Sequence, residues 1–64
     1  MIKVGDVYES DIAIYKVVKE TKCKYCIERI NKENHPCSPN KIFPINYIWK
    51  NCFNVSRLNH VKGV

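Results

Sequence analysis

The apolar residues of this chain are mostly β-branched. Its 64 residues include 8 Ile and 7 Val, but only one Leu, Leu58, and one Ala, Ala13. Leu and Ala are strong helix formers, whereas Ile, Val, Tyr and Phe suit the pleated, half-buried surface of a sheet. The composition therefore predicts a core built from strands.

The length limits how stable that core can be. A chain of 64 residues forms one domain, residues 1–64, and buries only about 60% of the surface that its unfolded form exposes. Its core supplies about 3–5 kcal/mol, so disulfides, a metal or a second subunit commonly add stability to such a domain. A zinc ion and a homodimer are therefore two candidate sources of additional stability for this domain.

Turn-forming residues divide the chain into short segments. Residues 2–20 are predicted to form a hairpin, because the β-branched and aromatic run at 11–20 follows a polar turn at 9–11. A third strand is expected at 25–31 and a closing strand at 54–58. Asn, Pro and Ser residues predict a loop at 31–41.

Residues 44–53 fit two periods. Apolar residues recur at helical spacing, and Pro44 suits the first position of a helix, but every second residue from 45 to 49 also fits a strand. We favour a short helix over 44–52. The predicted fold is thus mainly β (small α+β): an SH3-like or zinc-ribbon-like small barrel or sheet of three to five strands with one short helix.

The cysteines form a candidate metal site. Cys23 and Cys26 are a C-x2-C pair, whose thiolates can both reach one tetrahedral zinc ion. Cys37 and Cys52 would complete a structural site, or His35 would replace Cys52 as the fourth ligand. The alternative is that Cys37 and Cys52 are small buried residues.

No apolar run approaches the roughly 20 residues that span a membrane, and the N-terminus lacks the apolar stretch of a secretory signal. We therefore expect a cytoplasmic protein, in which cysteines are metal ligands or core thiols rather than disulfides.

The positive charge lies mainly in the second half of the chain. The formal net charge is +5, and residues 34–64 carry four cations and no acid. Such a half attracts phosphates or an acidic protein surface, although Lys also keeps small domains soluble.

Catalysis is not expected. Two glycines build no phosphate-binding loop, the six acids are scattered over predicted turns and strand surfaces, and His35 and His60 are expected at the surface. A chain of this size rarely encloses a pocket of about 300 Å³ or more.

Two binding functions remain. One is a non-catalytic inhibitor or accessory protein that docks on a protein of a nucleic-acid-handling defence system. The abundant Lys, Asn and Ile residues of this chain indicate an AT-rich coding sequence, as in many bacteria and phages. The alternative is a zinc-stabilised, basic nucleic-acid-binding module that stacks bases on exposed aromatic rings. Trp49 and Phe53 are expected in the core and Tyr25 and Tyr47 at the surface. The candidate binding residues are Tyr25, Lys41, Tyr47, Lys50 and Arg57.

Overall fold

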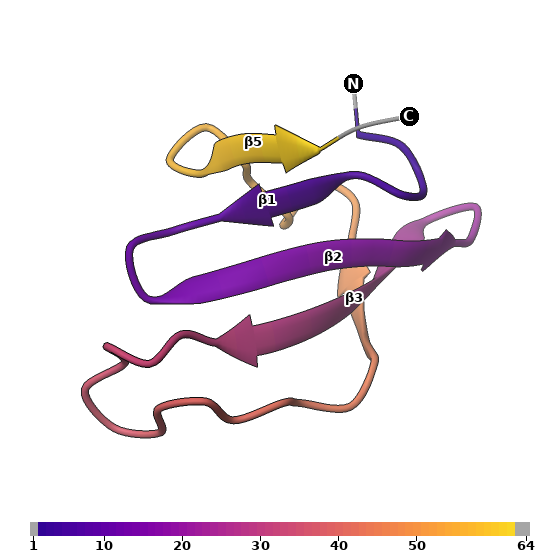
Figure 1. Ribbon diagram of the computed structural model, residues 1–64. Coiled ribbons are helices and arrows are strands. Elements are labelled where there is room, and N and C mark those ends of the chain that lie inside the picture. Colours follow the sequence, from indigo (N-terminus) through magenta and orange to yellow (C-terminus); the bar gives the residue numbers. More distant parts are fainter. Residues whose placement is uncertain (1, 63–64) are drawn as a thin grey trace.

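The computed structural model describes residues 2–62, which form one antiparallel sheet (Figure 1). Its strands are β1 (Val7–Glu9), β2 (Ala13–Glu20), β3 (Lys24–Asn31), β4 (Asn46–Trp49) and β5 (Asn59–Lys62). Their order in the sheet is β4-β3-β2-β1-β5. The first four strands form a meander, and β5 returns to pair with β1. The prediction of a mainly β domain is confirmed.

Short polar side chains close the two N-terminal turns. Between β1 and β2, the Ser10 hydroxyl accepts the backbone N–H of Ala13 at 3.1 Å. Between β2 and β3, the Thr21 hydroxyl accepts the backbone N–H of Lys24 at 3.0 Å. Ser and Thr favour turns because their hydroxyls replace a backbone partner in this way. The hairpin expected over residues 2–20 is therefore present as β1 and β2.

The short helix expected over 44–52 is wrong. Residues 46–49 form the strand β4, in which Tyr47 lies opposite Cys26 and Trp49 lies opposite Lys24. An isolated helix of this length is marginal in water, whereas the exposed side of β3 offers a complete set of backbone partners. Residues 2–62 contain no helix, and thus none long and apolar enough to cross a membrane.

The closing strand is also displaced from its predicted position. It lies at 59–62 rather than at 54–58. Residues 54–58 instead contain tight turns, in which the Asn54 side chain accepts the N–H of Ser56 at 2.8 Å and Val55 C=O accepts the N–H of Leu58 at 3.0 Å. Asn competes for nearby backbone groups and thereby favours turns over strands.

The core lies on one face of the sheet. It comprises the buried side chains of Tyr8, Val17, Tyr25 and Ile27. The segment after β4 crosses this face, as Figure 1 shows in orange, and packs Phe53, Val55 and Leu58 against the core. This crossing carries the chain from the β4 edge to the opposite edge, where β5 begins.

Two aromatic residues differ from the expectation. Tyr25 was expected at the surface but is only 9% exposed, and Trp49 was expected in the core but is 54% exposed. Phe53 is half-buried, and its ring meets that of Tyr25 edge to face at 6.0 Å. The reason is strand register: Tyr25 faces the crossing segment, and Trp49 lies on the outer strand.

A buried carboxylate links β1 to β5. Asp6 is one of the six acids that were predicted to lie mostly in turns or on strand surfaces, and it is 3% exposed. Its Oδ2 accepts the Tyr8 hydroxyl at 2.9 Å and the Lys3 backbone N–H at 3.0 Å. His60 of β5 stacks on the Tyr8 ring at 4.9 Å and places Nε2 at 3.8 Å from Asp6 Oδ1. Burial, followed by the hydrogen bond to Asp6, raises the pKa of Tyr8 above its ordinary value.

The loop at 31–41 is held by its own polar residues. The buried Asn31 side chain donates to Ser38 C=O at 2.8 Å, and Asn40 adopts the left-handed conformation with φ of 58°, which Asn tolerates. The chain then runs beside β3 again, with Ile30 opposite Ile42. Three steps along β3, from Ile30 to Ile27, correspond to four steps from Ile42 to Asn46, so the outer chain carries one extra residue near Pro44.

Candidate functional site

Exposed apolar side chains gather along one edge of the sheet. Six large apolar residues of the described chain are exposed, and four of them fall within residues 42–49. We call these four the β4 patch: Ile42 (68% exposed), Ile45 (53%), Tyr47 (55%) and Trp49 (54%). Large apolar side chains that are exposed in a group, and not singly, mark interaction sites.

The backbone of β4 adds to this patch. Lys50 N–H donates to Cys23 C=O at 2.9 Å. Because inward and outward residues alternate in an antiparallel pair, both backbone groups of Tyr47 and the N–H of Trp49 point away from β3 without a strand partner. The Trp49 C=O is already occupied, since it accepts the N–H groups of Cys52 at 2.9 Å and Phe53 at 3.1 Å. In the part of the chain that the structure describes, β4 has β3 as its one neighbouring strand. Its outer side therefore presents backbone donors and acceptors that a further strand can use.

Two lysines stand at the end of β4 in different electrostatic settings. Lys24 Nζ lies 4.3 Å from the centroid of the Trp49 ring. Lys50 Nζ donates to Glu20 Oε2 at 2.7 Å, and this hydrogen bond raises the pKa of Lys50. Glu20 thus compensates the charge of Lys50, whereas the charge of Lys24 makes a cation–π contact with an exposed aromatic face.

Two of the predicted binding residues meet, since Lys50 Nζ lies 5.2 Å from the centroid of the Tyr25 ring, and the other three are dispersed. Tyr47 lies on the β4 patch, and Lys50 follows the end of the strand. Lys41 is exposed, with Nζ 4.8 Å from the Phe43 ring centroid. Tyr25 is buried in the core, and Arg57 is exposed in the crossing segment. Their roles in binding stay predictions.

The four cysteines are free and are not gathered around one point. Cys23 and Cys52 lie in adjacent exposed turns, since Lys50 bonds to Cys23 and Cys52 N–H bonds to Trp49 C=O. Cys26 is buried within β3, and Cys37 is exposed in the loop. Cys52 was placed in the core as one alternative, and this is wrong. Among residues 2–62, no three His, Cys, Asp or Glu side chains are close enough to hold a metal ion. Zinc binding stays a prediction.

His35 is occupied within its own loop. Its Nδ1 accepts the backbone N–H groups of Cys37 at 3.1 Å and Ser38 at 3.0 Å. Neutral imidazole accepts through one ring nitrogen and donates through the other, so these bonds assign the proton to Nε2. The arrangement gives His35 a structural role in shaping the loop.

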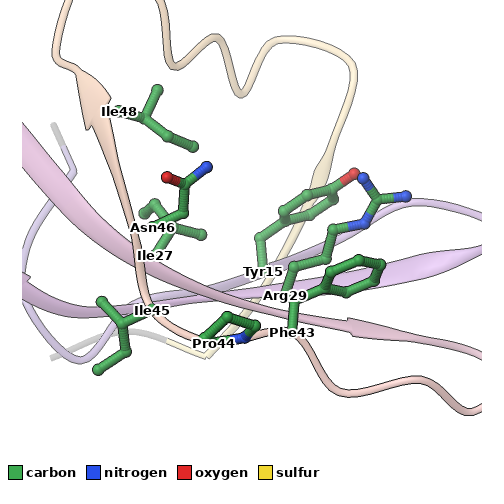
Figure 2. A pocket seen from close by; sticks show the side chains of 8 residues that line it. All are labelled: Tyr15, Ile27, Arg29, Phe43, Pro44, Ile45, Asn46 and Ile48. Atoms are coloured by element: carbon green, nitrogen blue, oxygen red, sulfur yellow. The ribbon is translucent and has the colours of Figure 1, made fainter.

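The core face also contains a partly open pocket of about 420 Å³. Figure 2 shows Tyr15, Arg29 and Phe43 together on one side of it and Ile45, Asn46 and Ile48 on the other, with Ile27 and Pro44 completing the lining. Sequence reasoning missed Arg29 and Phe43. The local signal was weak, because Arg29 interrupts an otherwise apolar alternation in β3 and Phe43 lies outside any strand.

No protein family, curated protein or solved structure matches this chain.

Proposed function

We propose that this protein is a small non-catalytic binding protein that docks on a protein partner through the β4 patch. The observation that carries the proposal is the coincidence of an open backbone edge with the exposed rings of Tyr47 and Trp49. An extended segment of a partner can add to such an edge through main-chain hydrogen bonds. Aromatic side chains beside it are the residue types that most often anchor interfaces.

The charge of the chain favours an acidic partner segment. The formal net charge is +5, and Lys24 stands over Trp49 within the edge itself. Opposite charges across an interface accelerate association and select among partners. The docked segment is therefore an extended strand that carries apolar residues with Asp or Glu beside them.

Composition suggests the wider role. A short basic chain rich in Lys, Asn and Ile resembles, in size and composition alone, the accessory proteins that phages and mobile elements use against host defence enzymes. We propose an inhibitor of a cytoplasmic, nucleic-acid-handling host protein. The order β4-β3-β2-β1-β5, with the last strand returning to the first, supports an SH3-like barrel over a zinc ribbon, which is organised around its metal.

A second candidate function is single-stranded nucleic-acid binding. It is favoured by three places where a cation stands over an aromatic ring: Lys24 over Trp49, Lys41 over Phe43, and Arg29 over Tyr15. Bases stack on such rings while neighbouring cations contact phosphates. In this alternative the domain is a zinc-stabilised module, and its basic surface binds the nucleic acid.

Capture from a host lysate, with and without nuclease, separates the two functions. A stoichiometric protein that survives nuclease and is lost from the Trp49→Ala variant supports docking through β4. Val61→Ala is the matched control, because Val61 is equally exposed (54%) and lies on β5 at the opposite edge. Recovery of nucleic acid, with steeply salt-dependent binding, would support the alternative.

A proline substitution tests the backbone contribution. The Tyr47 N–H points away from β3, so Tyr47→Pro removes an outward donor without breaking the β3–β4 ladder. Tyr47→Ala removes the side chain alone. If strand addition is correct, the proline variant binds the captured partner more weakly than the alanine variant while both retain the β-sheet circular dichroism spectrum. Equal affinities would contradict strand addition.

Light scattering on the free protein reports whether two copies use the same edge to form a homodimer.

A further inference from the structure

The pocket occupies the part of the core face that the crossing segment leaves open. Residues 53–58 cover the core at Tyr8 and Tyr25. Beyond them, Ile27 and Ile48 contribute apolar lining to the pocket. Pro44 and Ile45, where the outer chain carries its extra residue, also line it. The resulting volume of about 420 Å³ falls within the roughly 300–1,000 Å³ range of small-ligand sites.

Arg29 is the one charged residue in the pocket lining. Its Nε donates to Asn31 Oδ1 at 3.1 Å, and its guanidinium carbon lies 5.7 Å from the Tyr15 ring centroid and 5.3 Å from that of Phe43. These neutral contacts orient the guanidinium without compensating its charge. Arg29 forms no ion pair within residues 2–62.

His35 does not satisfy the terminal nitrogens of Arg29. An Arg29 terminal nitrogen lies 3.5 Å from His35 Nε2. The Nδ1 of this ring already accepts two backbone N–H groups, so Nε2 carries the proton and faces Arg29 as a donor. The terminal N–H groups of Arg29 therefore stay available in a half-buried, largely apolar site, where a planar fork matches a carboxylate bidentately.

We propose that this pocket binds a carboxylate carried on an apolar body. The carboxylate is held by the terminal nitrogens of Arg29, and the apolar part packs against Ile27, Ile48 and Pro44. A single cation in an apolar lining fits one negative charge better than the two of a phosphate monoester, since burying the second charge without a partner is costly. A free organic acid and the C-terminal residue of an apolar peptide share this chemistry.

The test uses two matched pairs of probes. The first pair is 4-phenylbutyrate and its uncharged amide, and the second is acetyl-Gly-Gly-Phe with a free or an amidated C-terminus. Titration is followed by 15N–1H correlation spectra of the full chain. We expect each bound acid to shift the amides of Tyr15, Arg29 and residues 45–48, and to bind at least about tenfold more tightly than its amide, equivalent to about 1.4 kcal/mol. Whichever acid binds identifies the source.

Variants assign the effect to the guanidinium. Arg29→Gln should weaken binding by about tenfold or more, and Arg29→Lys should recover only part of this loss, because Lys lacks the fork. Lys19→Gln is the control, since Lys19 is exposed on β2 and lies outside the pocket lining, and it should leave the affinity unchanged. Equal binding of an acid and its amide overturns the proposal. So does the absence of shifts with both acids at about 10 mM. Both results need only the unmodified protein, so they stand even if a variant fails to fold.

Discussion

Replacement of Tyr8 by Phe removes one hydroxyl from the contact between β1 and β5. Tyr8 is 6% exposed, and its hydroxyl donates to Asp6 Oδ2 at 2.9 Å. The Asp6 side chain is 4% exposed, so water has little access to the carboxylate oxygen that loses its donor. The Lys3 backbone N–H, at 3.0 Å, still donates to that oxygen.

The expected loss follows from this burial. A hydrogen bond to a charged group contributes about 1.5–3 kcal/mol. In a domain of this size, each kcal/mol changes Tm by about 4–8 °C. Tyr8→Phe should therefore lower Tm by roughly 6–24 °C. Because the whole core supplies only about 3–5 kcal/mol, this loss is a substantial fraction of the wild-type stability.

The same hydroxyl makes stability depend on alkaline pH. The pKa of Tyr8 is raised in the folded state by burial and by the bond to Asp6, whereas a tyrosine in the unfolded chain ionises near pH 10. The stabilisation is fully present below about pH 10 and is lost as pH rises from there through the folded pKa, because the unfolded chain releases its proton first. The difference in Tm between wild type and Tyr8→Phe should narrow over that range.

Thermal unfolding followed by circular dichroism measures both effects. Tyr47→Phe is the control, because it makes the same chemical change at a side chain that is 55% exposed, where substitutions typically change stability by less than about 0.5 kcal/mol. If Tyr8→Phe unfolds at the same temperature as Tyr47→Phe at pH 7, the buried hydrogen bond does not contribute as argued.

Three further predictions concern the core, the surface and the cysteines. Ile27→Ala, at a core position 2% exposed, should cost about 2–5 kcal/mol and lower Tm by about 8 °C or more in circular dichroism; an unchanged Tm would show that the core does not depend on this side chain. Glu20→Gln breaks the exposed pair with Lys50 and should leave Tm nearly unchanged, since such pairs contribute little; a loss comparable to that of Tyr8→Phe would contradict this. If zinc stabilises the domain, metal analysis should find one ion per chain and a chelator should abolish the β-sheet spectrum, whereas an unchanged spectrum after metal removal would exclude the site of Cys23, Cys26, Cys37 and Cys52.

Local sequence predicted the first half of the fold well. The strands expected at 11–20 and 25–31 are present at 13–20 and 24–31. Both are β-branched or aromatic runs, and each is preceded by a turn that a neighbouring Ser10 or Thr21 closes. A strand bounded by such turns depends mainly on residues within its own hairpin, and sequence reasoning therefore reaches it.

The second half depends on distant partners. Ile45, Ile48, Trp49 and Cys52 satisfy a helical period and the residues from 45 to 49 satisfy a strand period, so the pattern alone did not separate the two. The free side of β3 decided for a strand, through the pairs Cys26 with Tyr47 and Lys24 with Trp49. These partners lie more than twenty positions away in the sequence, beyond the reach of any local rule.

Composition and length were enough to predict a small, basic domain built from strands, because composition sets which secondary structure the side chains tolerate and length limits how much surface can be buried. The three-dimensional arrangement was needed to establish that Asp6 and Tyr25 are buried, that Trp49 is exposed, and that Arg29 lines a pocket without an ion pair to any residue of 2–62. Burial depends on which strand lies at the edge and which face the segment 53–58 covers, and both follow from contacts between parts of the chain that are far apart in sequence.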